Sequence, residues 1–403
     1  SIMNVEVVMA KRVLYLVGLC ISSSALAAPE PQATELGGGK LIPLLSVGLK
    51  HDDNIFSQAS SEQSDTILTL KPSVQWLQEK DTTSVALTYS GDYGVYQDSD
   101  DDDYDDHTVS FDASLSPSDF VEVGFGASYG WLHDNRGEGS SEGLNAASRG
   151  EPDEYEISSV NLDLDFGRDS AMLGFLLQMS TDDIEYQNNL NETAFRNRDE
   201  TDIVGRVYAN ISGGKTKLFI QASQKDNSYD ENPILGGKLD SDEDGFSVGI
   251  EWEATGKTSG LIRVGEVDKE FDSSARKDGS MNIWEVQVAW SPRTYSHILL
   301  NSSSVPRETN GTGNFIEAQD TSLTWLHAWS DDLSTTFTFT DGSDEYANAS
   351  REDDRQNISL SLSYDWRRWM TIGANYTHSE RDSNQNEFDF DRNIVSVSVD
   401  MSL

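Results

Sequence analysis

Hydrophobic and polar residues alternate along most of this chain in short runs, which are separated by polar segments rich in glycine, proline, serine or aspartate. The last run shows the pattern best, because Val395, Val397, Val399, Met401 and Leu403 fall on one face with serine or aspartate between them. Successive side chains of a strand point to opposite faces of its sheet, so this period of two predicts strands with one apolar side. About eighteen such runs follow one another.

A chain made only of such strands fits a closed barrel in a lipid bilayer. In lipid every backbone polar group needs a partner within the protein, and a closed barrel has no unpaired edge. A last run that ends on Leu403 is expected to close against the first run. We therefore predict an all-β fold, a transmembrane antiparallel up-and-down β-barrel of about eighteen strands, with sixteen as the alternative.

The connections between the runs alternate in length, which predicts the topology. Short turns are expected near residues 116–119, 167–170, 212–215, 255–257 and 291–293. Long connections are expected at 52–63, 97–107, 133–155, 181–200, 225–244, 267–281, 302–319, 341–356 and 378–392. Barrels of the outer membrane have short periplasmic turns and long external loops, so both termini should be periplasmic. Aromatic girdles are predicted from Trp76, Trp290, Trp366 and Trp369 at the turn end and Tyr93, Tyr96 and Trp131 at the loop end.

The first residues have the pattern of a secretory signal peptide. Lys11 and Arg12 precede an apolar core, and Ala25 and Ala27 form an A-x-A cleavage site. We predict a signal peptide at 1–27, a short periplasmic segment at 28–40 and the barrel at 41–403. A start at Met9 would leave residues 1–8 outside the protein. The only cysteine, Cys20, lies in the leader, so the mature chain is expected to lack disulfides.

Composition excludes several classes of function. The formal net charge is −41, which argues against nucleic-acid binding because phosphate contacts need a basic surface. Hydrophobic residues make up 36% of the chain, too few for a helical membrane protein but compatible with a barrel that has a polar lumen. The expected location is the cell outer membrane of a Gram-negative bacterium, with outer-membrane lipid as a partner.

If the apolar faces meet lipid, the alternate residues line the lumen. Nine carboxylates would then point inward: Asp92, Asp112, Glu122, Asp163, Asp165, Glu251, Glu285, Asp365 and Asp400. Four basic residues would face them: Lys71, Arg206, Lys217 and Arg263. The excess would favour cations and repel polyanions. The alternative, which has about equal weight, is that these charges pair with one another and serve only to keep the lumen wall hydrated. Asp92, Asp112, Glu122, Asp163, Asp165, Arg206, Glu251, Arg263 and Glu285 are the selectivity candidates.

Acidic segments and histidines are the candidates for metal binding or catalysis in this chain. The acidic run at 98–106 is expected to be a solvated loop, with a cation site as the alternative. Residues 240–251 match a calcium-loop pattern, but Glu251 would lie about 20 Å along a strand from Gly245, too far to close the shell. A weaker rim site of Asp240, Asp242 and Asp244 stays open.

Four histidines are expected at outer strand ends: His51, His107, His133 and His378. His51 and His378 would approach each other across the closing seam, where an Asp/His hydrolytic site is conceivable. No serine or second motif completes such a constellation. We predict no enzyme activity, no cofactor and no catalytic or metal-binding residue.

Four segments carry a resemblance to a known family: KHDDNIF at 50–56, SDTILTLKPSV at 64–74, GDYGVY at 91–96 and NIVSV at 393–397. With these segments the chain resembles the β-barrel porins found with bacterial exopolysaccharide synthesis systems. Leu403 departs from the aromatic residue with which outer-membrane barrels usually end. The resemblance implies a conduit or accessory for exopolysaccharide export, which would work with polysaccharide and periplasmic polysaccharide-export proteins. The alternatives are a cation-preferring general porin for small solutes and a plugged structural or surface-interaction barrel.

Overall fold

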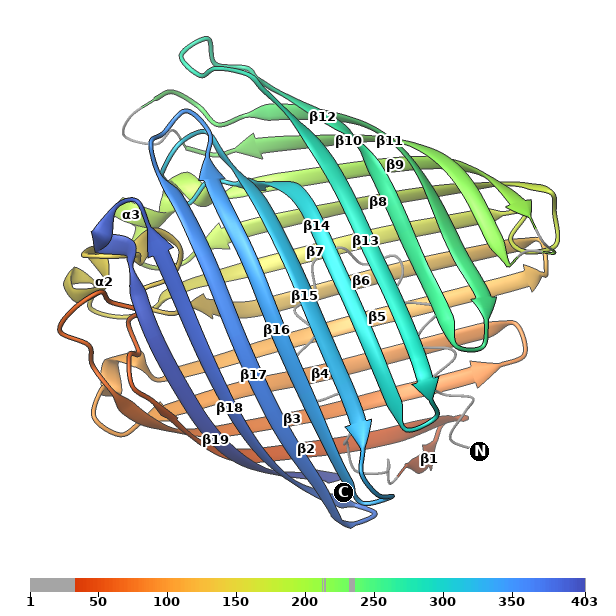
Figure 1. Cartoon of the computed structure of the whole chain (residues 1–403), viewed down its shortest axis with the longest axis horizontal. Coiled ribbons are helices and arrows are strands. Elements are labelled where there is room, and N and C mark those ends of the chain that lie inside the picture. Colours follow the sequence, from red (N-terminus) through yellow and green to blue (C-terminus); the bar gives the residue numbers. More distant parts are fainter. Residues whose placement is uncertain (1–32, 212, 214, 232–235, 403) are drawn as a thin grey trace.

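Eighteen long strands, β2 to β19, form one antiparallel sheet that closes on itself in the computed structural model, which describes residues 33–211, 213, 215–231 and 236–402 (Figure 1). The strands are β2 (Gly39–Asp52), β3 (Asp65–Lys80), β4 (Thr83–Tyr96), β5 (Tyr104–Ser118), β6 (Val121–Asp134), β7 (Asp153–Phe166), β8 (Leu173–Tyr186), β9 (Arg198–Ile211), β10 (Thr216–Tyr229), β11 (Ser241–Thr255), β12 (Thr258–Phe271), β13 (Gly279–Arg293), β14 (Ser296–Glu308), β15 (Phe315–Ala328), β16 (Leu333–Tyr346), β17 (Glu352–Arg367), β18 (Met370–Ser383) and β19 (Phe390–Ser402). The predicted barrel and its count of eighteen are confirmed. The predicted signal peptide at 1–27 and Leu403 lie outside the described residues.

The barrel closes between its last and first strands. β19 runs antiparallel to β2, with Val397 opposite Leu49 and Ser402 opposite Leu44. β2 starts at Gly39, before this pairing begins, and there a short strand, β1 (Thr34–Leu36), pairs with it instead. The end of the segment predicted at 28–40 therefore pairs with the first barrel strand, beside the seam.

Strands continue farther at the loop end than the alternating pattern predicts. Both ends of the predicted loop at 181–200 are strand, because β8 reaches Tyr186 and β9 begins at Arg198. Likewise β10 reaches Tyr229 inside the predicted loop at 225–244. Strands of 13 to 16 residues exceed the ~9–11 that cross a bilayer. Outside the lipid both faces of a strand can be polar. The strands therefore continue there, although the sequence no longer alternates between apolar and polar residues.

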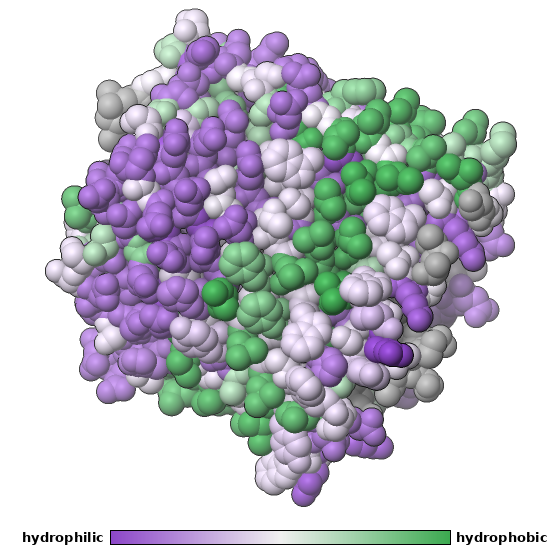
Figure 2. Space-filling view, viewed as in Figure 1, coloured by the Kyte–Doolittle hydropathy of each residue, from purple (hydrophilic) through white to green (hydrophobic). Residues whose placement is uncertain are grey.

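The outer face of the barrel carries an apolar band toward the turn end. Figure 2 shows this band beside a hydrophilic surface that covers the loop end. Exposed apolar side chains alternate along many of the strands, as Leu218 and Ile220 do in β10 and Phe246 and Val248 do in β11. Trp290, Trp366 and Trp369 are exposed at the turn end, and Trp131 is exposed near the loop end. The prediction that Tyr96 belongs to an aromatic girdle is wrong, because its side chain is buried beneath the loops.

Carboxylates on the outer face mark the part of the wall above this band. Asp242 of β11 lies directly opposite Asp226 of β10 and Glu270 of β12. Asp244 lies opposite Asp268. Like charges in such register are unfavourable, and charged side chains on the lipid face cost more still. We infer that the loop-end part of the strands stands outside the lipid.

Helices occur in the long loops as single turns, α2 (Asn145–Ser148) and α3 (Leu190–Thr193), together with short 3₁₀ turns. Within the described ranges, no helix combines the length and apolar character needed to cross a membrane.

Candidate functional site

The polar alternate positions of the strands form the lumen face, and every selectivity candidate lies on it. In β7, Asp163 and Asp165 alternate with Leu162 and Leu164, and in β5 Asp112 follows the exposed Phe111. Arg263 of β12 lies directly opposite Glu285 of β13, so these two candidates share one face of the sheet. The lumen is therefore the surface on which a solute would meet these side chains.

Ion pairs tie the basic lumen residues to carboxylates. The pairs and their N–O distances are Lys71–Asp92 at 2.6 Å, Arg168–Glu122 at 2.9 Å, Arg206–Glu251 at 3.7 Å, Lys217–Asp169 at 3.2 Å and Arg263–Glu285 at 3.0 Å. All four basic residues named from the sequence take part. Much of the lumen charge is thus compensated locally.

Other lumen carboxylates have uncharged neighbours. Asp163 accepts a hydrogen bond from Gln178 at 2.8 Å, and Asp165 accepts one from Tyr208. Asp112 is exposed between Ala86 and Gly126 on the adjacent strands. These groups keep the lumen negative after pairing, which is the condition for cation preference.

The lumen face is divided into two unlike walls. From β15 through the seam to β7, it carries mainly hydroxyl, amide and glycine residues, and we call this wall the polar arc. Its members include Ser322, Thr324, Thr338, Ser359, Ser361, Asn375, Thr377, Ser396, Ser398, Ser46, Ser73, Gln75, Thr88, Ser90, Ser110, Ser128 and Asn161. Several bond across strands, as Ser361 does to Asn375 at 2.7 Å and Gln75 to Thr88 at 3.2 Å. These uncharged side chains offer hydrogen bonds, and the charged lumen residues of β3 to β7, such as Asp112 and Asp163, stand among them.

The opposite wall, β8 to β13, combines charges with aromatic and aliphatic groups. Leu176, Tyr208, Phe219 and Leu261 pack together on its lumen face. The Arg206 guanidinium lies 4.0 Å from the centre of the Phe219 ring. This packing immobilises the wall, because the guanidinium is held by the ring on one side and by Gln221 and Glu251 on the other.

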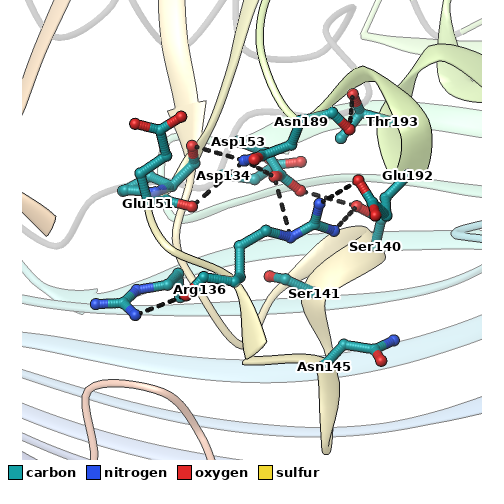
Figure 3. A network of polar contacts seen from close by, with 12 residues as sticks. Asp134, Arg136, Ser140, Ser141, Asn145, Glu151, Asp153, Asn189, Glu192 and Thr193 are labelled. Carbon is teal, nitrogen blue, oxygen red and sulfur yellow. Dashed lines mark hydrogen bonds and ion pairs between the residues drawn. The ribbon is translucent and has the colours of Figure 1, made fainter. Parts of the chain in front are cut away.

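The loop between β6 and β7, residues 135–152, crosses the loop end of the barrel, and we call it the bridging loop. Its near side is fixed by polar contacts (Figure 3). Arg136 forms an ion pair with Asp102 of the β4–β5 loop. Arg149 lies 3.5 Å from Asp153 and 3.3 Å from Glu192 of the β8–β9 loop.

Apolar packing also anchors the near side. Ala146 is fully buried in a cluster with Ile55, Phe56, Ile67 and Tyr96, contributed by the β2–β3 loop and the ends of β3 and β4. Gly137 has a φ of +92°, and a Cβ there would lie 2.0 Å from the Phe56 carbonyl oxygen. Only glycine allows the backbone of residue 137 to lie this close to Phe56.

The far side of the bridging loop reaches strands across the barrel. The Glu142 carboxylate lies 2.7 Å from Arg351 of the β16–β17 loop and 3.4 Å from Arg381 of β18. Gly143 lies against Glu387 and Phe388 of the β18–β19 loop. The bridging loop thus links parts of the wall that lie six or more strands apart around the barrel.

Arg351 is the most buried arginine among these loop contacts. Its guanidinium donates hydrogen bonds to Asp353 at 2.5 and 3.0 Å and lies 3.6 Å from the Phe388 ring centre and 4.4 Å from that of Tyr346. Burial disfavours the charged form, but Asp353 and the charge of Glu142 outweigh it and raise the pKa of Arg351 above its ordinary value. The arginine therefore stays charged.

A second element enters the loop end from another side. Pairing between β13 and β14 stops at Trp284–Ser304, although β14 continues to Glu308 (Figure 1). Beyond this point the β14–β15 hairpin bends inward, so Phe315 packs on Val267, Met281 and Ile283 of the lumen face. Lys269 binds Glu308 at 2.5 Å and Glu243 at 2.7 Å. The hairpin is thereby fastened to the wall.

The acidic segments serve structural roles at these loops. Asp102 is buried against Arg136, and Asp103 accepts a hydrogen bond from the Tyr96 backbone. The expectation of a solvated loop at 98–106 is therefore wrong for Asp102. Asp240 binds Lys238 and the Tyr229 backbone, whereas Asp242 and Asp244 project from the outer face of β11. In the described part of the chain, no three His, Cys, Asp or Glu residues are grouped to hold a metal ion.

The histidines near the seam lie on the outer face. His378 bonds to Asn393 at 3.0 Å, and Asn393 bonds to Asp53, so the two strands do meet as expected. His51 bonds to Thr66 and shares its face with Leu49, which is exposed on the barrel exterior. Neither imidazole points into the lumen, so the arrangement offers no hydrolytic site to a solute there.

The sequence reasoning missed Glu142, Arg351 and Arg381. A signal was nevertheless present, because Arg136, Arg149 and Arg351 are isolated basic residues inside acidic loops. In a chain of charge −41, an arginine in such a loop has carboxylates close by and is a candidate for an internal ion pair.

The comparison with protein families agrees with the barrel architecture. A family model described as "Putative beta-barrel porin 2" matches residues 28–403. No curated protein matches the chain.

Solved structures with similar folds are outer-membrane barrels of low sequence identity. OccK2 (OpdF) of Pseudomonas aeruginosa is 12% identical, with a TM-score of 0.47 over 90% of this chain and 98% of that one. A BenF-like porin of Pseudomonas fluorescens is 10% identical, with a TM-score of 0.49 over 90% and 99%. The siderophore receptor PirA of Pseudomonas aeruginosa is 9% identical, with a TM-score of 0.46 over 91% and 81%.

Proposed function

From the premise that this chain belongs to the putative β-barrel porin 2 family, we propose that its lumen is a conduit for a hydroxyl-rich, neutral or weakly charged solute. The polar arc is the observation that carries this proposal. Hydroxyl and amide side chains can exchange hydrogen bonds with sugar hydroxyls as readily as with water, so a glycan could pass without a deep binding minimum. The conduit would need no chemistry of its own.

The solute that we favour is an exported polysaccharide. The four segments that resemble exopolysaccharide-associated porins support this choice, and the negative lumen limits it to polymers of low negative charge. Periplasmic polysaccharide-export proteins would then deliver the polymer at the turn end of the barrel.

Two observations favour other functions. The excess of lumen carboxylates suits a cation-preferring general porin for small solutes. The bridging loop suits a plugged barrel with a structural or surface-interaction role.

Deleting the gene is expected to trap polysaccharide in the periplasm, because the polymer would lose its passage through the outer membrane. Fractionation of periplasm and medium, followed by sugar analysis, measures this, and a plasmid copy of the gene should restore export. Unchanged export with slower uptake of small cations would favour the general porin. Unchanged export and uptake would favour the structural role.

A further inference from the structure

We propose that the bridging loop is a gate that opens by releasing its far side, with the Glu142 carboxylate as its latch. This inference rests on the proposed conduit function, since a gate acts only where a solute passes. It concerns regulation of the same lumen.

The two sides of the bridging loop are held unequally. On the near side, Arg136 and Arg149 form three ion pairs, and Ala146 is buried in the apolar cluster. The loop also continues there into β6 and β7. Release of this side would break several contacts at once and expose apolar surface, so the near side is the hinge.

The far side depends on one carboxylate. Glu142 is the group on the loop that contacts both Arg351 and Arg381. Glu138 approaches Arg392 only to 3.9 Å, and its side chain is 49% exposed, so water screens this pair. Gly143 adds packing against Phe388 but has no side chain to hold it there.

The receptor for Glu142 stays assembled without it. Arg351 keeps its hydrogen bonds to Asp353 and its position between Phe388 and Tyr346. Arg381 keeps its hydrogen bond to the Phe388 carbonyl at 2.7 Å and lies 4.8 Å from the Phe390 ring centre. Opening therefore leaves the wall intact, and the same receptor can take the carboxylate back. These are the properties of a reversible latch.

The test compares E142Q with E138Q in the full-length barrel. Both variants remove one negative charge from the same loop by the same isosteric change, but only E142Q removes the contact with Arg351 and Arg381. Single-channel recordings in planar bilayers should show the open fraction of E142Q raised roughly tenfold, because the ion pairs with Arg351 and Arg381 are lost. E138Q should behave as the unmodified protein.

A second readout does not require conduction. Chymotrypsin cleaves after leucine, and Leu144 lies two residues from Glu142, in the part of the loop that the latch holds. Release of the far side should speed cleavage after Leu144 in E142Q but not in E138Q, as mass spectrometry of the fragments would show.

Each outcome has a separate meaning. Unchanged conductance and unchanged cleavage in E142Q would overturn the latch while leaving the conduit proposal in place. Faster cleavage in E142Q with no conduction in any protein would overturn the conduit and, with it, the gate. Equal effects of E142Q and E138Q would show that loop charge, and not the Glu142 contact, controls the opening.

Discussion

Replacing Arg351 by alanine is expected to lower the free energy of unfolding by about 3–5 kcal/mol. The side chains of Arg351 and Asp353 are each 1% exposed, so the substitution leaves a buried carboxylate without its counter-charge. It also removes the group packed between Phe388 and Tyr346 and the receptor of Glu142. Guanidinium unfolding of the detergent-solubilised barrel, followed by tryptophan fluorescence, measures this loss.

Arg307 provides the matched control. It also pairs with two carboxylates, Asp320 and Asp344, but its side chain is 44% exposed. Water screens such pairs, so R307A should cost no more than about 1 kcal/mol. If R351A lowered the free energy of unfolding no more than R307A does, the contacts around Arg351 would not be a major source of stability at the loop end.

Neutralising Asp112 and Asp163 is expected to weaken cation preference by up to about fivefold. A cation that passes about 8 Å from one carboxylate is stabilised by about 0.5 kcal/mol in water. Two carboxylates therefore contribute about 1 kcal/mol, which is about a fivefold enrichment of cations before salt screens the charges. Neither carboxylate is half of an ion pair described above, so D112N/D163N strands no basic side chain. Reversal potentials under a salt gradient in planar bilayers measure the effect.

A double variant on the outer face controls for total charge. D244N/D268N removes the same charge from opposing positions outside the lumen and should leave the reversal potential unchanged. A shift in this control as large as that of D112N/D163N would mean that total charge, not lumen charge, sets selectivity. Anion preference in the unmodified protein would contradict the lumen assignment as a whole.

The sequence predicts the wall of this barrel well and its loop end poorly, for one physical reason. Within lipid a strand must alternate, so Val395 and Val397 or Asp163 and Asp165 reveal both strand and face. Above the lipid this constraint ends. Tyr96 therefore reads as a girdle residue although it is buried, and the ends of β8 and β10 read as loops although they are strands.

The bridging loop and the inward hairpin escape the pattern for a related reason. The contact of Glu142 with Arg351 joins loops far apart in sequence, and neither residue has a periodic context that points to the other. Phe315 would face outward by simple alternation with Leu323 and Trp325, yet it packs on the lumen face because the hairpin leaves β13. Such placements depend on the path of the chain and not on its local period.

The central claim is that the lumen passes neutral, hydroxyl-rich solutes, and flux of neutral oligosaccharides through reconstituted barrels tests it most directly. Proteoliposomes with the unmodified protein or E142Q would be placed in gradients of uncharged oligosaccharides of increasing length, with empty liposomes as the control. We expect swelling that depends on the protein, is faster with E142Q and declines with oligosaccharide length. Swelling no faster than that of empty liposomes for both proteins, at every length, would contradict the account.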